Sequence, residues 1–241
     1  DNAVVGSEGY IFIYVSTEFP SYVLKRRFFM FDDLQSFFES TVGQITTVFV
    51  MLILLLLIMI PSGGKKKKPD MKAMTVSALL IALAVILSNI KLFSMPQGGS
   101  VTLLSMLPVV LCAYLFGTRQ GVIAGVCLGL LNLILGPYVI HPVQLLIDYP
   151  LAFGAMGIGG IFRNRKNGLI KGYLLGVAGR YVCAVLSGFI FFGSYAPEGF
   201  NALTWSLWYN LTYLAAECAI TVAILFIPAV RKGLEGLKNN L

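Results

Sequence analysis

The sequence contains few charged residues and few of the side chains that catalysis and metal binding use. Charged residues make up 12% of its 241 positions, whereas an ordinary soluble domain carries about a quarter. There is one histidine, and the four cysteines lie inside apolar stretches without CxxC spacing. The pattern indicates neither a zinc site nor a disulfide framework, and it leaves no second histidine to complete a catalytic triad.

Several motifs of energy-using and hydrolytic proteins are also missing. The chain has no GxxxxGK[ST] phosphate loop, no HExxH and no GxSxG. No recognisable motif therefore allows it to hydrolyse ATP. If the protein moves a solute uphill, the energy must come from a partner or from an ion gradient.

Long apolar runs dominate what remains, since 57% of the residues are hydrophobic. A membrane-spanning helix needs roughly 20 apolar residues. The sequence predicts an all-α, polytopic membrane protein with one N-terminal span at 40–60 and six further spans, at 73–90, 103–116, 121–135, 142–162, 173–192 and 202–227.

The basic residues alternate between connections and predict the topology. The net charge is +7, but lysine and arginine occupy every second connection instead of one face, which argues against nucleic-acid binding. The positive-inside rule places these connections and the C-terminus in the cytoplasm of a multi-pass protein of the cell membrane. We expect an extracytoplasmic extension (1–39), an additional transmembrane helix (40–60), a basic cytoplasmic linker (61–70) and a six-helix substrate-binding domain (71–241).

Polar and aromatic residues gather in the outer half of the last three predicted spans. Asp148 lies about two turns inside its helix, and Gln144 lies one turn above it on the same face. Trp205, Tyr209 and Asn210 lie at a similar depth. A lone carboxylate among aromatic rings suits a flat cationic ligand. The aromatic residues alone are equally typical of an interfacial belt that binds nothing.

Two further groups of residues require an explanation. Arg180 and Glu217 lie at equal depth in adjacent helices, which predicts a structural ion pair because either charge alone would be costly in a membrane. Ala78, Ala82 and Ala84 place small residues on the first helix of the domain, where they suit either packing within the bundle or docking of a partner.

Four segments, in order, resemble the thiamine-specific S component of energy-coupling factor (ECF) transporters. They are MPQGGS (95–100), YVIHPVQ (138–144), DYPLAF (148–153) and FGSYAPEG (192–199), and the resemblance extends over residues 71–237. It implies a six-helix bundle that binds thiamine from outside and docks on a transmembrane coupling protein carrying two ATPase subunits. No catalytic residue, cofactor or metal is implied.

The resemblance also implies roles for individual residues. Asp148 would offset the charge of thiamine, Asn210 would hydrogen-bond its pyrimidine, and Gly188 would leave room for the ligand. The substrate-binding set is completed by Tyr138, Tyr149, Trp205 and Phe192. Ala78 and Ala82 match the surface that meets the coupling protein, and residues 96–100 resemble an outer gate.

The sequence departs from this family in three places. Ala184 stands where the family commonly has a histidine, which predicts lower affinity or altered specificity, and Phe192 replaces a tryptophan of some members. Residues 1–68 are not part of the family pattern. The alternatives left open are an S component for another vitamin or a thiamine precursor, a non-transporting membrane scaffold, and an intramembrane enzyme that uses Asp148 and His141.

Overall fold

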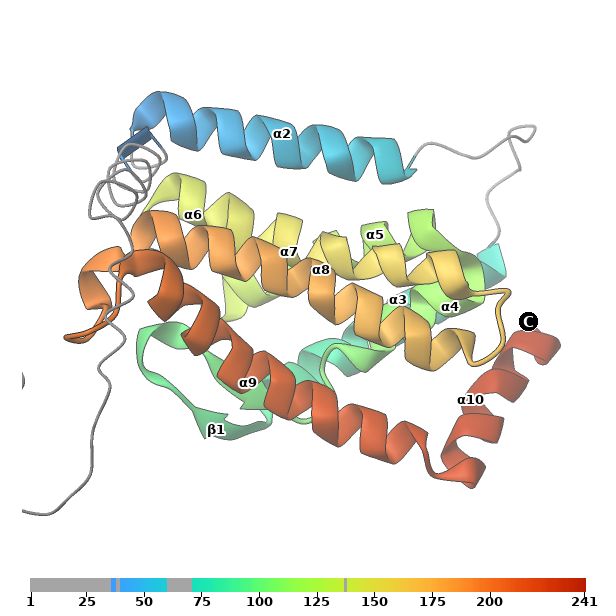
Figure 1. Ribbon diagram of the computed structural model, residues 1–241. Coiled ribbons are helices and arrows are strands. Elements are labelled where there is room, and N and C mark those ends of the chain that lie inside the picture. Colours follow the sequence, from blue (N-terminus) through green and yellow to red (C-terminus); the bar gives the residue numbers. More distant parts are fainter. Residues whose placement is uncertain (1–35, 38–39, 60–70, 137) are drawn as a thin grey trace, which may run out of the picture.

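The computed structural model describes residues 36–37, 40–59, 71–136 and 138–241. The predicted linker and all but two residues of the predicted extension lie outside this part of the chain. A helical bundle comprises α3 (Met71–Asn89), α4 (Leu107–Phe116), α5 (Thr118–Leu135), a composite helix over 142–162, α8 (Gly168–Phe191) and α9 (Ala202–Leu225) (Figure 1). Five of these helices are long and apolar enough to cross a membrane. The all-α, multi-pass prediction is thus confirmed.

The first predicted span is also helical. Helix α2 (Thr41–Met59) runs along the outside of the bundle, where it contacts α5 and the beginning of the composite helix (Figure 1). One contact face can be identified near its N-terminus, where Thr47 is only 7% exposed while Val42, Ile45 and Phe49 point outward. The bundle therefore has an additional helix on one side.

The composite helix changes its geometry where the predicted site residues lie. It consists of α6 (Pro142–Leu146), a π-helical turn η2 (Ile147–Leu151), α7 (Ala152–Ala155) and a 3₁₀ segment η3 (Met156–Phe162). Pro150 has no N–H to donate and disfavours a regular α-helix. Gly129 of α5 faces this turn, and a Cβ added there would lie 2.4 Å from the carbonyl oxygen of Tyr149. The glycine lets α5 pack directly against the irregular backbone.

Helix α4 is shorter than predicted. It has 10 residues and begins at Leu107, with Pro108 in its first turn, where proline is favourable. Before it lies an antiparallel hairpin of β1 (Lys91–Ser94) and β2 (Ser100–Thr102), joined by a 3₁₀ turn η1 (Pro96–Gly98). The prediction of one apolar helix over 103–116 was therefore wrong for its first four residues, because residues 103–106 connect the hairpin to the helix.

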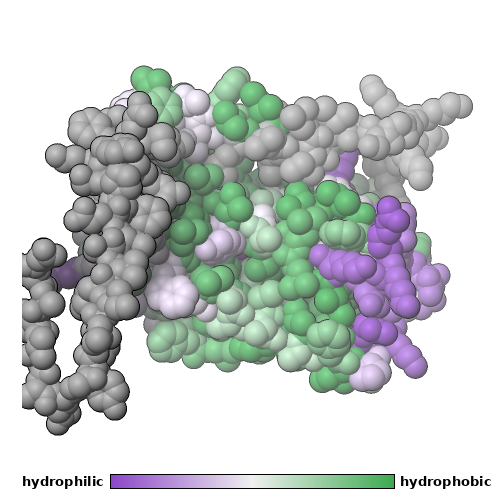
Figure 2. All heavy atoms as spheres, viewed as in Figure 1, coloured by the Kyte–Doolittle hydropathy of each residue, from purple (hydrophilic) through white to green (hydrophobic). Residues whose placement is uncertain are grey.

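The two ends of the bundle differ in character. A packed core of large residues, including Tyr173, Met156, Leu169 and Leu225, lies towards the end where α9 turns into the amphipathic helix α10 (Pro228–Asn240). Hydrophilic side chains gather at this end, while the visible flank of the bundle is mostly hydrophobic (Figure 2). The opposite end carries the hairpin, the short turn η4 (Gly193–Tyr195) and a cavity.

Candidate functional site

A cavity of about 230 Å³ opens at the end of the bundle opposite α10. Its walls come from the hairpin, the ends of α3, α5 and α8, the start of the composite helix and the first two thirds of α9. All seven residues that the sequence predicted to bind substrate line this one cavity: Tyr138, Asp148, Tyr149, Gly188, Phe192, Trp205 and Asn210. The polar cluster is therefore a concave site and not only an interfacial belt.

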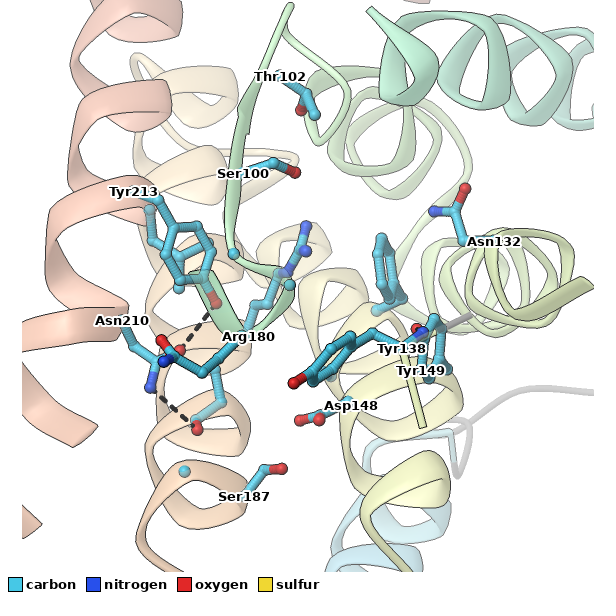
Figure 3. Close-up of a pocket in the computed structure, with 18 of the residues that line it drawn as sticks. Ser100, Thr102, Asn132, Tyr138, Asp148, Tyr149, Arg180, Ser187, Asn210 and Tyr213 are labelled. Carbon is cyan, nitrogen blue, oxygen red and sulfur yellow. Dashed lines mark hydrogen bonds between the residues drawn. The ribbon is translucent and has the colours of Figure 1, made fainter. Parts of the chain in front are cut away.

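Asp148 supplies negative charge from the π-helical turn (Figure 3). Gln144, one turn earlier and 1% exposed, donates a hydrogen bond from its Nε2 to the Asp148 carboxylate at 2.5 Å. The same Nε2 also donates to the Tyr138 carbonyl oxygen at 3.1 Å. Among the described residues no cation forms an ion pair with Asp148. The carboxylate is thus held in place but remains able to interact with a positively charged guest.

Aromatic rings form one wall beside this carboxylate. The ring centroids of Tyr138 and Phe192 are 6.1 Å apart, and their planes are inclined by 23°. The Tyr149 hydroxyl accepts a hydrogen bond of 2.7 Å from the Tyr138 backbone N–H. Desolvation, with Tyr195 nearby, raises the pKa of Tyr138 above its ordinary value. The wall is therefore neutral and suited to stacking against a flat ring.

Helix α9 supplies the facing wall. Trp205 packs against Tyr209 with 5.7 Å between their ring centroids. Asn210, which is 5% exposed, donates from Nδ2 to the carbonyl oxygens of Ser206 and Ala184, and its Oδ1 accepts a hydrogen bond of 2.8 Å from the Tyr213 hydroxyl. An amide oxygen has two lone pairs. The Asn210 Oδ1 can therefore accept one further hydrogen bond, from a ligand.

Gly188 lies where α8 and α9 approach each other. A Cβ at this position would come within 2.2 Å of the Ser206 Oγ and 3.1 Å of the Asn210 Nδ2. The Ser206 hydroxyl donates at 2.8 Å to the Val185 carbonyl oxygen and fixes the helices at this separation. The glycine thus permits the helix contact that places Asn210, in addition to lining the cavity.

The ion pair predicted between Arg180 and Glu217 is not formed. The ion pair found in the described part of the chain joins Arg231 and Glu235, at 3.8 Å. Arg180 instead stacks its guanidinium over the Phe153 ring, 4.1 Å from the centroid. Glu217 accepts hydrogen bonds from residues 102–106. Residue spacing indicated that Arg180 and Glu217 lie at equal depth, but not the direction in which each side chain points. It also did not show that residues 102–106 lie outside the helix and need hydrogen-bond acceptors.

Several residues of the cavity were not assigned from the sequence. Ser187, Asn132 and Tyr213 line it (Figure 3), and so do both Arg180 and Glu217. Ser187 is only 1% exposed, and its hydroxyl interacts with the Asp148 carboxylate. The one sequence feature that could have identified Ser187 as a cavity residue is its position directly before Gly188, because residues next to a glycine that lines a cavity lie close to that cavity.

The hairpin covers one side of the cavity. At its tip, the Gly99 N–H donates a 3.0 Å hydrogen bond to the Tyr209 hydroxyl, which in turn donates to the Pro96 carbonyl oxygen. Gly98 adopts φ = +88° and lies against the Tyr138 ring. Its positive φ favours glycine. Residues 96–100, which the sequence predicts to be a gate, thus contact two walls of the cavity at once.

The remaining predicted residues lie outside the cavity. His141 caps α6, where its Nδ1 accepts a hydrogen bond from the Val143 N–H, and its ring stacks on Phe191. Ala78 and Ala82 are exposed on one face of α3, whereas Ala84 is fully buried in the core. The small-residue surface therefore comprises two alanines rather than three.

Comparisons with known proteins agree with this architecture. The family model "Thiamine transporter protein (Thia_YuaJ)" matches residues 74–234. The thiamine transporter ThiT of Bacillus subtilis (strain 168) is 39% identical in an alignment of 173 residues, and the match covers 64% of this chain and 90% of that protein. ThiT of Lacticaseibacillus paracasei is 28% identical over 136 residues, 49% of this chain and 68% of that protein.

A solved structure extends the likeness to three dimensions. ThiT from Listeria monocytogenes superposes with a TM-score of 0.55 at 27% identity, covering 66% of this chain and 96% of the other. These relatives are named as transporters, so the intramembrane enzyme is set aside. The chain belongs to the thiamine transporter protein family, the family of thiamine-specific S components that its motifs predicted.

Proposed function

We propose that this protein captures thiamine from the outer side of the cell membrane and delivers it inward when an ATP-driven partner acts on it. The observation that carries the proposal is the Asp148 carboxylate, which lines an aromatic cavity and has no ion-pair partner among the described residues. A buried charge of this kind is costly unless something neutralises it. A cationic ligand removes that cost when it binds.

The chemistry of thiamine matches the walls of the cavity. Its thiazolium ring carries a permanent positive charge, which Asp148 offsets. Its aminopyrimidine is flat and can stack between the wall of Tyr138 and Phe192 and the wall of Trp205. The exocyclic amino group of that ring is a donor, and the Asn210 Oδ1 retains acceptor capacity for it.

Uphill transport driven by ATP requires a partner, since the sequence has no nucleotide-binding motif. The exposed Ala78 and Ala82 lie one turn apart on α3 and would let a helix of a coupling protein approach closely. We infer that a transmembrane coupling protein with two ATPase subunits docks on this face. Helix α2 packs on α5 and the composite helix, so its described contacts leave the alanine face of α3 free.

The orientation that this function needs follows from charge. Arg163, Arg165 and Lys166 lie at the end of the bundle that carries α10, and the cavity opens at the other end. By the positive-inside rule the α10 end is cytoplasmic and the cavity faces outward. Residues 1–39 would then be extracytoplasmic, residues 40–60 an additional span and residues 61–70 a cytoplasmic linker before the binding domain at 71–241.

Thiamine binding to the purified full chain tests the proposal directly. We expect quenching of tryptophan fluorescence, because Trp205 lines the cavity. Saturable quenching at or below micromolar thiamine would support the proposal, and its absence would refute it. A membrane scaffold would show no binding, and Asp148→Ala would change nothing in it.

Ala184 favours one second candidate, a ligand related to thiamine. Its methyl group lines the cavity where the family commonly has a histidine, so one hydrogen-bonding group is replaced by space. A panel of thiamine, its pyrimidine alcohol and riboflavin distinguishes the candidates. Tighter binding of the pyrimidine alcohol than of thiamine would identify a precursor transporter.

A further inference from the structure

Glu217 is a buried carboxylate to which the proposed thiamine contacts assign no role. Its residue is 3% exposed, and it lies near the floor of the cavity on α9. Instead of a cation it has four hydrogen-bond donors. The Thr102 N–H and hydroxyl donate to Oε2 at 3.1 and 2.6 Å, and the Ser105 hydroxyl and Met106 N–H donate to Oε1 at 3.1 and 3.3 Å. Two carboxylate oxygens accept about four hydrogen bonds, so the group is saturated.

All four donors lie at the base of the hairpin. Two belong to Thr102, the last residue of β2, and two to the connection of residues 103–106 that leads to α4, in which Leu104 has φ = +55°. Backbone groups outside regular structure must find other partners when water is excluded. The two backbone N–H groups that Glu217 accepts would otherwise lack an acceptor in this buried region. The carboxylate therefore takes the place of a helix or sheet partner at the base of the hairpin.

The tip of the hairpin is attached to the same helix. Tyr209 of α9 bonds the Gly99 N–H and the Pro96 carbonyl oxygen, eight residues before Glu217. Eight residues of α-helix span about 12 Å. Helix α9 thus holds the hairpin at two points, and it also carries Trp205 and Asn210 on the cavity wall. We call residues 91–102 the hairpin lid.

The two attachments differ in strength. At the base, four buried donors converge on a charged acceptor, and such bonds are about twice as strong as neutral ones. At the tip, the phenol hydroxyl on the half-exposed side chain of Tyr209 makes neutral hydrogen bonds, and the Thr212 hydroxyl adds a weak one to the Met95 sulfur at 3.6 Å. The contacts of Tyr209 are therefore the weaker of the two attachments.

We propose that Glu217 is a positioning residue that fixes the base of the hairpin lid to α9, so that the lid closes in register over bound thiamine and sets the rate of thiamine release. The inference rests on the proposed function, since it concerns the residence of that ligand. Glu217 does not need to touch thiamine. A merely structural carboxylate would stabilise the fold and leave the release rate unchanged.

The test measures thiamine release and protein stability separately, in the full-length protein. Thr102→Val removes one donor to Glu217 at nearly constant volume, and Glu217→Gln replaces the charged acceptor with an amide that carries its own donors. Thr75→Val is the matched control, because Thr75 makes a helical hydrogen bond on the exposed surface of α3. Dissociation is followed by the recovery of tryptophan fluorescence after stopped-flow dilution, and stability by thermal unfolding without ligand.

We expect Thr102→Val to accelerate dissociation roughly tenfold, the order of one lost hydrogen bond to a charged group. Association should change less than dissociation, and Thr75→Val should release thiamine at the wild-type rate. Glu217→Gln should accelerate thiamine dissociation more than Thr102→Val does. If the Glu217→Gln variant does not fold, the dissociation rate of Thr102→Val alone tests the inference. A wild-type dissociation rate in Thr102→Val, even with a lower unfolding temperature, would overturn the inference. Failure of the wild-type protein to bind thiamine would instead refute the proposed function.

Discussion

Asp148→Asn removes the charge of the site while preserving its shape. The asparagine Oδ1 can still accept the 2.5 Å hydrogen bond that Gln144 donates to the carboxylate. The substitution therefore tests the electrostatic contribution separately from the packing of the composite helix. Arg180 lines the same cavity but forms no ion pair with Asp148, so the substitution breaks no salt bridge.

The magnitude follows from the proposed contact between the carboxylate and the thiazolium ring. Two unit charges 4 Å apart attract by about 4 kcal/mol at an effective dielectric constant of about 20. Loss of part or all of this attraction, about 2–4 kcal/mol, corresponds to a Kd about 30- to 700-fold higher. The pyrimidine alcohol has no cationic ring, and its Kd should change by less than about threefold.

The assay uses a protein with a single fluorescent reporter. The chain has two tryptophans, and Trp208 is 56% exposed and lies outside the cavity. In a Trp208→Phe background, Trp205 alone reports binding by both ligands. An equal loss of affinity for thiamine and for the neutral alcohol would refute the charge argument, and so would no loss for either.

Three other substitutions test the packing, specificity and docking arguments. Gly188→Ala would place a methyl group 2.2 Å from the Ser206 Oγ, so we expect about 1–3 kcal/mol lower stability in chemical unfolding together with weaker thiamine binding. Gly233→Ala, where a Cβ meets nothing within 4 Å, is its control and should not destabilise the protein. Ala184→His introduces the hydrogen-bonding group that is common in the family. It should lower the Kd for thiamine by about tenfold, the effect of one added hydrogen bond. An unchanged or higher Kd in titration would show that this position does not face the ligand. Ala82→Trp places a bulky ring on the exposed face of α3. It should abolish uptake of labelled thiamine by cells and leave the Kd of the purified protein for thiamine unchanged. Normal uptake would show that the coupling protein docks on another face.

Most of the fold could be predicted from hydropathy, because a helix that crosses a membrane must be apolar over nearly its whole length. The predicted spans at 73–90 and 121–135 differ from α3 and α5 by at most three residues at either end. The hairpin and the late start of α4 could not be predicted. Ser105 is the one hydrophilic residue between positions 103 and 116, and periodicity does not distinguish a buried connection from a helix in such an apolar run.

The residues that line the cavity could be predicted where depth and residue type suffice. Asp148 and Gln144 are four residues apart, so helical geometry alone placed them on one face, and the structure joins them by a hydrogen bond. Arg180 and Glu217 show the limit of the same reasoning. Their depths were equal, but hydrogen bonding also depends on the direction in which each side chain leaves its helix and on competing partners.

The sequence by itself determined that this is a multi-pass membrane protein, which end of the bundle carries the basic charge and which residues to expect around the cavity, since composition and short motifs record these properties locally. Only the tertiary structure decided that Glu217 serves the base of the hairpin lid, that Gly188 spaces two helices and that Ser187 and Tyr213 line the cavity. The physical reason is that these contacts join residues up to 115 positions apart. Partners so distant are chosen by the packing of whole helices, which no local pattern of residues specifies.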